Sequence, residues 1–202
     1  MIHLSQIRRH LDAHRPATHD RPAPRGRAAV AIVLSGEVDG LALCLIRRAE
    51  RAGDPWSGHI ALPGGRIGRD DETPRAAAER ETREEVGLVL HPAMYLGALS
   101  ELAVRIAGHE IGMTLAPFVF YAGTDMPPLA TSDEVAESYW TPLADLWGDE
   151  YRSTLQVARA GTHVAYPSVR VGAHHLWGLT YRVLTDFGAV IGAPFGAGEG
   201  TP

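Results

Sequence analysis

The chain of 202 residues has a single cysteine, no long hydrophobic run and no excess of basic residues. Cys44 cannot form an intramolecular disulfide, and its place in the apolar run 41–46 predicts a buried strand residue. No stretch approaches the about 18 consecutive apolar residues that a membrane-spanning helix needs. The first residues also lack the apolar core of a signal peptide. The sequence therefore predicts a cytoplasmic protein that does not associate with a membrane.

The net charge of the chain argues against nonspecific binding to nucleic acids. The formal net charge is −5, from 19 basic and 24 acidic residues, whereas proteins that bind nucleic acids nonspecifically present a net basic surface. The hydrophobic content of 45% is enough for a packed core, and the length suits one domain of ordinary size with extensions. A small-molecule ligand is therefore expected rather than a nucleic acid.

Hydrophobic periodicity and turn residues divide the chain into three regions. Residues 1–26 combine a weakly amphipathic N-terminal helix with a linker that contains three prolines, residues 27–195 form the domain, and residues 196–202 form a flexible tail. Strands are expected at 28–34, 41–47, 60–62, 93–99, 111–121 and 137–141, and a short helix at 142–147. Residues 153–156 and 176–190 should supply at least one more helix. Mixed strands around one functional helix predict an α/β sandwich.

The segment 80–88, RETREEVGL, predicts a helix that carries three carboxylates on one side. An α-helix turns by roughly 100° per residue, so Glu81, Glu84 and Glu85 share a face. Like charges at this spacing cost roughly a few tenths of a kcal/mol per pair. A hard divalent cation such as Mg²⁺ or Mn²⁺ would offset that cost. Glu-rich helices also occur as solvated faces, so the flanking segments must decide between a metal site and a solvated surface.

The flanking segments favour the metal site. Gly64 and Gly65 end an apolar stretch upstream and allow the backbone to approach a ligand closely. Thr73 and Pro74 suit the start of a helix, and Gly87 suits a left-handed residue at its end. A loop, a capped helix and a stop, with acids on one face, indicate a functional unit.

These residues resemble the signature box of the Nudix hydrolase family. The matching positions are Arg80, Glu81, Glu84, Glu85, Gly87 and Leu88, with Glu72 at the family's acidic position, eight residues before Arg80. Two positions depart from the pattern. Arg66 stands at the glycine position, so Gly65 fits only if the loop has one extra residue, and Thr82 replaces an aliphatic residue. The resemblance implies a Nudix-type α/β/α sandwich with a mixed β-sheet, a catalytic loop-helix-loop, and helical extensions at both ends.

The resemblance also implies roles for individual residues. Glu81, Glu84 and Glu85 would bind Mg²⁺ or Mn²⁺, Arg80 would orient them by ion pairing, and the carbonyl of Gly65 would add a ligand. A box glutamate or an acid of the segment 132–137 should accept the proton of the attacking water. Within that segment Glu134 is favoured over Glu137, the alternative being that both are ordinary loop acids.

Three further segments resemble the coenzyme A pyrophosphatase-type subgroup. They are LIRRA at 45–49, WSGHIALPGG at 56–65 and LWGLTYRVL at 176–184. Arg47, Arg48, His59, Gly64 and Gly65 are the expected substrate-binding residues. The chain departs from the subgroup at Asp54, where the motif has arginine, and at His59, where it usually has glutamine.

The expected reaction is hydrolysis of coenzyme A or acyl-coenzyme A to 3′,5′-ADP and 4′-phosphopantetheine. The alternative enzymes would act on ADP-sugars, dinucleoside polyphosphates or oxidised nucleoside triphosphates. A nucleotide-sensing module that has lost catalysis is the alternative outside enzymes, although the retained glutamates and Arg80 speak against it. The N-terminal helix and the tail suggest a homodimer.

Overall fold

The computed structural model describes residues 2–18, 23–37, 40–106, 108–159 and 162–196. The helices are α1 (Leu4–Ala13), α2 (Pro74–Val86), α3 (Leu143–Trp147) and α4 (Gly178–Val190), with 3₁₀ turns η1 (Pro92–Met94) and η2 (Asp149–Tyr151). The first strands are β1 (Arg27–Ser35), β2 (Ala42–Arg48), β3 (Ile60–Ala61), β4 (Gly64–Arg66), β5 (Tyr95–Ala98) and β6 (Leu102–Ile106). The later strands are β7 (His109–Tyr121), β8 (Val135–Pro142), β9 (Arg152–Arg159), β10 (Thr162–Val171) and β11 (His174–Trp177).

The larger sheet is mixed, as the sequence predicts. Its main path runs β3-β2-β1-β7-β5, while β4 pairs with β1, β6 with β7, and β8 with β2. Strands β1 and β7 are parallel, in register from Arg27↔Thr114 to Leu34↔Tyr121. The other pairings in this sheet are antiparallel. Strand β1 therefore lies between neighbours on both sides, which explains its nearly continuous apolar sequence.

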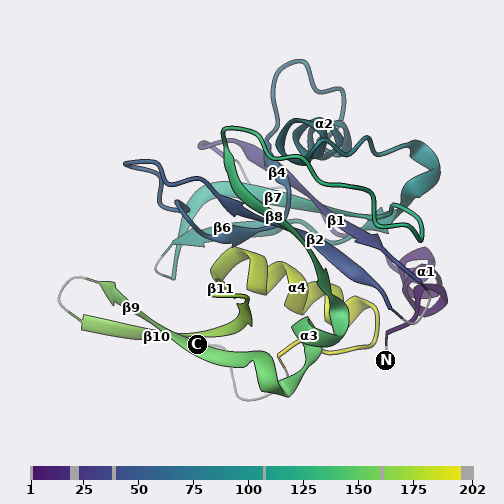
Figure 1. The fold of residues 1–202 in the computed structure, drawn as a ribbon. Coiled ribbons are helices and arrows are strands. Elements are labelled where there is room, and N and C mark those ends of the chain that lie inside the picture. The colour runs from purple at the N-terminus through teal and green to yellow at the C-terminus, as the bar shows by residue number, and fades with distance from the viewer. Residues whose placement is uncertain (1, 19–22, 38–39, 107, 160–161, 197–202) are drawn as a thin grey trace.

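Two cores lie on opposite faces of this sheet and make three layers (Figure 1). Successive residues of a strand point to opposite faces, so Ala29, Ala31 and Val33 pack under α2, whereas Ile32 and Leu34 join the core beneath α4. Ala77 and Ala78 of α2 are fully buried in the first core. Because alanines occupy both surfaces, α2 lies close to the sheet, and this closeness sets the position of its glutamates.

The N-terminal helix packs on the domain. Ile7 and Leu11 of α1 are buried in the core that also contains α4. The Gln6 amide donates to the Ile191 carbonyl at 2.8 Å, and a His10 ring nitrogen lies 3.1 Å from the Val190 carbonyl. These contacts join the N-terminal helix to the end of the C-terminal helix.

The region after residue 150 differs from the prediction. Residues 153–156 belong to strand β9, which forms an antiparallel three-stranded sheet with β10 and β11, and helix α4 starts only at Gly178. Short polar strands such as β9 have weak periodicity, because their pairing depends on partners distant in the chain. The predicted tail falls, apart from Gly196, outside the described residues.

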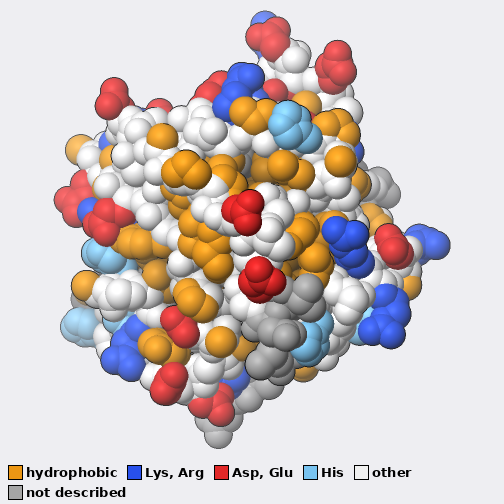
Figure 2. All heavy atoms as spheres, turned by 45° about the vertical axis from the view of Figure 1, so that its right-hand side comes forward, with side chains coloured by type: hydrophobic (Ala, Val, Ile, Leu, Met, Phe, Trp, Pro, Cys, Tyr) orange, Lys and Arg blue, Asp and Glu red, His pale blue; other side chains and the backbone are white. Residues whose placement is uncertain are grey.

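Charges of both signs occur on the surface, and the described helices are short. On the face shown in Figure 2, basic side chains are scattered among acidic and hydrophobic ones and do not form a continuous patch. None of the described helices is long and apolar enough to cross a membrane. Cys44 is buried in β2, as predicted, and burial, followed by the charge of Glu85, raises the pKa of its thiol to about 12.

Candidate functional site

Helix α2 begins and ends where its capping residues predict. The Thr73 hydroxyl accepts a hydrogen bond from the Ala76 N–H at 3.1 Å, and Gly87 closes the helix with a φ of 73°. Thr82, which replaces an aliphatic residue, is buried, and its hydroxyl donates to the Ala78 carbonyl at 2.7 Å. Because this hydrogen bond satisfies the hydroxyl, threonine is accommodated in the core.

The three glutamates of α2 do not share one environment. Glu85 is only 3% exposed and accepts a hydrogen bond from the Gly64 N–H at 2.8 Å. Glu81 lies against Gly65, where an added Cβ would stand 2.5 Å from the Glu81 Cδ. The Glu84 side chain is 51% exposed and bonds to Arg80 at 2.9 Å. In the described ranges, no group of three His, Cys, Asp or Glu side chains is placed to hold a metal ion.

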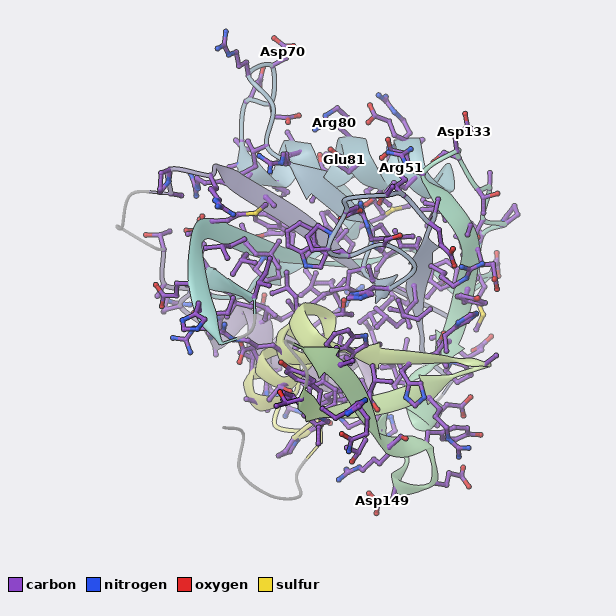
Figure 3. All side chains as sticks on the ribbon, turned by 90° about the vertical axis from the view of Figure 1, so that its left-hand side faces the viewer. Arg51, Asp70, Arg80, Glu81, Asp133 and Asp149 are labelled. Carbon is purple, nitrogen blue, oxygen red and sulfur yellow. The ribbon has the colours of Figure 1, made fainter. Side chains whose placement is uncertain are left out.

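Arg80 connects the glutamates to the loop before the helix. It makes two hydrogen bonds with Asp71, at 3.0 and 2.9 Å, and one each with Glu81 and Glu84, both at 2.9 Å. Its Nη2 also donates to the Arg66 carbonyl at 3.2 Å. Figure 3 places Arg80 and Glu81 together along the α2 side of the molecule. Of the three glutamates that Arg80 was expected to orient, it pairs with Glu81 and Glu84, while Glu85 is held by the Gly64 N–H instead.

Asp71, rather than Glu72, is the acid that meets Arg80. Glu72, at the family's acidic position, is exposed. The hydrogen bonds from Arg80 hold the pKa of Asp71 below its usual value. Sequence spacing alone missed this role, because both acids precede the helix and only the loop conformation selects one of them.

The carboxylates that face the cavity have perturbed acidity. Loss of water raises the pKa of Glu85 to about 7, with further contributions from the negative charges of Glu81 and Glu134. Burial also raises the pKa of Glu81, despite its ion pair with Arg80. Two crowded carboxylates beside the Gly65 backbone supply the hard oxygen donors that suit Mg²⁺ or Mn²⁺. Glu84 bonds to Arg80 through Oε2, and its Oε1 would be the oxygen that joins the same donor set.

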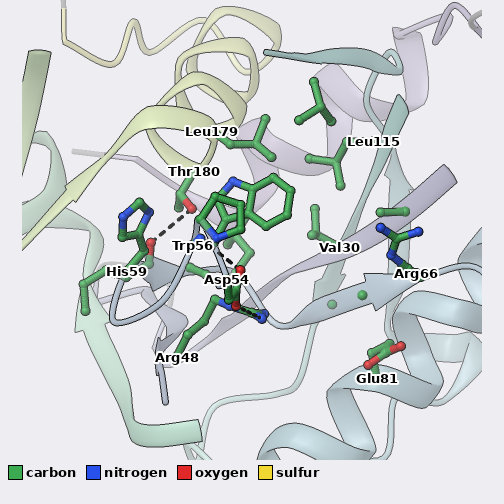
Figure 4. Close-up of a pocket in the computed structure, with 18 of the residues that line it drawn as sticks. Val30, Arg48, Asp54, Trp56, His59, Arg66, Glu81, Leu115, Leu179 and Thr180 are labelled. Carbon is green, nitrogen blue, oxygen red and sulfur yellow. Dashed lines mark hydrogen bonds and ion pairs between the residues drawn. The ribbon is translucent and has the colours of Figure 1, made fainter. Parts of the chain in front are cut away.

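A cavity of about 610 Å³ opens beside these carboxylates. One end is polar and includes Glu81, Glu85, Gly64, Gly65, Arg48 and Glu134. The other end is largely apolar and includes Val30, Leu115, Leu179, Val183 and Trp56 (Figure 4). Its apolar wall comes partly from α4, whose approach to β1 and β7 the sequence did not predict. The cavity therefore joins a charged site to an apolar channel.

Most of the predicted substrate-binding residues line this cavity. Arg48, His59, Gly64 and Gly65 do so, as does Glu134. Arg47 does not, and its guanidinium instead pairs with Glu137 at 2.7 Å. Arg47 meets Glu137 while Arg48 lines the cavity, and the register of β2 with β8 shifts between these two residues. The structure therefore does not bring Arg47 to the site.

Asp54, which stands where the subgroup motif has arginine, forms an ion pair in the structure. Asp54 pairs with Arg48 at 2.9 Å and accepts a hydrogen bond from the Trp56 N–H at 3.0 Å. Partial burial works to raise the pKa of Asp54, but these two interactions outweigh it and lower the pKa. The buried Nε of Arg48 has no hydrogen-bond partner within the described residues. Asp54 thus holds Arg48 in the cavity, and the Arg48 Nε–H remains as a donor for a ligand.

The His59 ring has more apolar surroundings than Asp54 and Arg48. Its ring lies 4.7 Å from the Trp177 ring, measured between centroids. Burial, assisted by the positive charge of Arg48, lowers the pKa of His59. His59 is therefore a neutral hydrogen-bonding group of the cavity wall at physiological pH.

In metal-free protein, Glu85→Gln is expected to raise the free energy of unfolding at pH 7 by about 3 kcal/mol. The pKa of Glu85 is about 7 when folded, against 4.5 for an ordinary glutamate. The folded state thus keeps the proton to higher pH, and wild-type stability falls as pH rises from 4.5 to 7. Glutamine avoids this loss and can still accept from Gly64. Urea unfolding with EDTA at pH 4.5 and 7.5 measures the difference, and an equal effect at both values would contradict it.

Comparison with known proteins identifies the family. The NUDIX domain family matches residues 24–159. Human mitochondrial coenzyme A diphosphatase NUDT8 is 32% identical over 178 residues, which cover 86% of this chain and 71% of that protein. An uncharacterised Schizosaccharomyces pombe protein is 37% identical over 116 residues, 56% of this chain and 35% of the relative, so this chain spans about a third of that relative's length.

A solved structure supports the same fold. The MutT/nudix family protein from Enterococcus faecalis superposes with a TM-score of 0.55 at 20% identity, covering 94% of this chain and 67% of the other. The layered arrangement around a mixed sheet is thus shared over almost the whole chain. With the box residues on α2 and the family match over 24–159, this chain belongs to the Nudix hydrolase family.

Proposed function

We propose that this protein is a metal-dependent diphosphatase that cleaves coenzyme A or acyl-coenzyme A into 3′,5′-ADP and 4′-phosphopantetheine. One observation carries the proposal: the partly buried Glu81 and the buried Glu85 line a cavity whose other end is apolar. A pantetheine or acyl chain would occupy the apolar end while the diphosphate meets the carboxylates. The human relative NUDT8 is named a coenzyme A diphosphatase, and this similarity supports the same substrate class.

The chain's residues suit hydrolysis at the polar end. Glu81, Glu85 and the Gly65 carbonyl would hold Mg²⁺ or Mn²⁺, joined by Glu84, and Arg80 would fix their orientation. When bound, the metal ions would neutralise phosphate oxygens and acidify a water molecule. Arg48 would donate its spare Nε–H to a phosphate oxygen. Positioning and electrostatic stabilisation would then supply most of the rate, as in phosphoryl transfer generally.

Glu134 is the proposed general base. It lines the cavity together with Glu81 and Glu85, and its charge adds to the raised pKa of both. Its Oε1 pairs with Arg51 at 3.0 Å on the rim. Glu137 points instead to Arg47 and Tyr139. Glu134 would therefore accept the proton of the attacking water.

The test is a substrate panel with Mg²⁺ or Mn²⁺. Purified protein is incubated with coenzyme A, an acyl-coenzyme A, ADP-ribose, a diadenosine polyphosphate and oxidised nucleoside triphosphates, and the products are separated by chromatography. Release of 3′,5′-ADP from coenzyme A is the expected result. Faster hydrolysis of another member would replace coenzyme A by that substrate. No product from any member would contradict the enzymatic proposal and favour a sensing module.

Gly65→Ala should lower kcat by about 10-fold, because even small displacements of catalytic groups are costly. The new Cβ would stand 2.5 Å from the Glu81 carboxyl carbon, so the carboxylate must move. Gly40→Ala is the matched control, since an added Cβ there meets nothing within 4 Å. Steady-state kinetics and circular dichroism of both variants measure the effect. Equal activity in the two variants would show that the Glu81–Gly65 contact does not matter.

A further inference from the structure

The cavity has three lining arginines among the described residues, and the chain contains no lysine. Two of these arginines form ion pairs that offset their charge: Arg48 pairs with Asp54 at 2.9 Å, and Arg51 pairs with Glu134 at 3.0 Å. Arg66 has no carboxylate partner in the described part of the chain, and its Nη1 donates to the Arg25 carbonyl at 3.1 Å. Its remaining donors stay available, so Arg66 is the arginine of this cavity whose charge no carboxylate of the described residues offsets. The spare Nε–H of Arg48, by contrast, belongs to a guanidinium that is already paired with Asp54.

The backbone of Arg66 is fixed by β1 on one side and by Arg80 of the carboxylate helix on the other. Strand β4 pairs with β1, with Arg66 opposite Ala28, and the Arg66 carbonyl accepts a hydrogen bond from Arg80. Successive strand residues face opposite sides, and Gly65 is the neighbour that touches Glu81. Figure 4 shows Arg66 and Glu81 on opposite sides of β4. The Arg66 guanidinium is thus placed in the same cavity but away from the carboxylates.

We propose that Arg66 determines specificity by binding a phosphomonoester of the substrate that is separate from the diphosphate being cleaved. A planar guanidinium binds phosphate oxygens in pairs, and such charge-assisted hydrogen bonds are strong. A second phosphate would otherwise enter a cavity lined by Asp54, Glu81, Glu85 and Glu134 without a free cation. The inference rests on the proposed function, in which this group is the 3′-phosphate of coenzyme A. It also gives a role to the extra loop residue.

The test compares coenzyme A with dephospho-coenzyme A, which differs only by the 3′-phosphate. Arg66→Gln should lower kcat/KM for coenzyme A by about 10-fold, mainly through KM, because charged hydrogen bonds to phosphate contribute at this level. Its kcat/KM for dephospho-coenzyme A should stay within about 2-fold of wild type, because the lost contact is absent there. Arg66→Lys should recover part of the preference. Arg69→Gln, which removes the same charge three residues further along the chain and outside the cavity, should leave the kinetics of both substrates unchanged.

Two outcomes in this assay would overturn the role of Arg66. An equal loss for both substrates would show that Arg66 supports the loop or the general field. No change for either would show that it does not touch the substrate. If Arg66→Gln instead weakens hydrolysis of a nucleoside triphosphate and not of coenzyme A, the bound phosphate belongs to a polyphosphate chain, and the 3′-phosphate assignment is wrong.

A binding experiment separates this inference from the proposed function. Calorimetry with 3′,5′-ADP and with AMP needs no turnover, and the wild type should bind the bisphosphate more tightly by about 10-fold. Arg66→Gln should remove that difference. If wild type hydrolyses neither coenzyme A substrate but keeps an Arg66-dependent preference for 3′,5′-ADP, the proposed function fails and the phosphate site stands. Equal binding of the two nucleotides to wild type would overturn the phosphate site.

Discussion

Glu85→Gln is expected to lower kcat for diphosphate hydrolysis by at least ~10²-fold, the scale seen when one electrostatic catalytic group is removed. Glutamine preserves the shape of the side chain and can still accept the Gly64 N–H hydrogen bond. It removes the negative charge that a divalent cation requires, from a position that is almost fully buried. Kinetics with Mg²⁺ and with Mn²⁺ measure the loss. Glu84→Gln should have a comparable effect.

Glu79→Gln is the matched control for these variants. Glu79 lies on the same helix, pairs with Arg75 at 3.2 Å and does not line the cavity, so its kcat should be close to that of the wild type. A thermal shift on adding Mn²⁺ gives a second measurement that does not depend on turnover. Wild type and Glu79→Gln should gain stability with the ion, and Glu85→Gln should gain little. Wild-type turnover in Glu85→Gln would refute its assignment as a ligand.

The Glu84 variant tests a ligand that also contacts Arg80. Glu84 is half exposed and bonds to Arg80 through Oε2. Its Oε1 would ligate the ion while Arg80 keeps its bonds to Asp71, Glu81 and Glu84. A loss of turnover in Glu84→Gln, with a reduced thermal shift by Mn²⁺, is the result expected of a metal ligand. A reduced turnover with an undiminished thermal shift would assign Glu84 to another role.

Glu134→Gln is expected to lower kcat by about 10²-fold, within the range typical of general-base catalysis. Glutamine cannot accept the proton of the attacking water, and Glu134 reaches the cavity from the loop before β8. Binding should be nearly unaffected, because the loss concerns a proton transfer in the transition state. The measurement is kcat and KM of the variant and of the wild type in the presence of Mg²⁺.

Glu137→Gln is the control that tests the choice between the two acids. Its carboxylate is engaged by Arg47 and Tyr139 and does not line the cavity, so kcat should remain near the wild-type value. A large loss in Glu137→Gln together with normal activity in Glu134→Gln would reverse the assignment. Normal activity in both variants would return the role of the base to a glutamate of α2.

The catalytic helix was predictable because its signals are local. Thr73, Gly87 and the spacing of Glu81 and Glu85 act within a few residues of one another, so the start, the end and the acidic face follow from the sequence. Burial of Cys44 was predictable for the same reason, since an apolar run predicts a strand in the core. Six of the eight strands between residues 27 and 142 also follow from hydrophobic periodicity, with boundaries displaced by no more than two residues, whereas the short strands β4 and β6 were not predicted.

Contacts between distant segments decided the features that the sequence did not predict. The strands after residue 150 were missed because their pairing is non-local, and the apolar end of the cavity exists only because α4 packs across β1 and β7. The sequence by itself determined the family, the carboxylate helix and the glycine loop, through short-range capping and spacing. Only the tertiary structure decided that Asp71 holds Arg80, that Arg48 and not Arg47 enters the cavity, and that Arg66 has no acidic partner among the described residues. The physical reason is that a side chain's partner depends on which surfaces the packed layers bring together, and chain order does not encode this within a short segment.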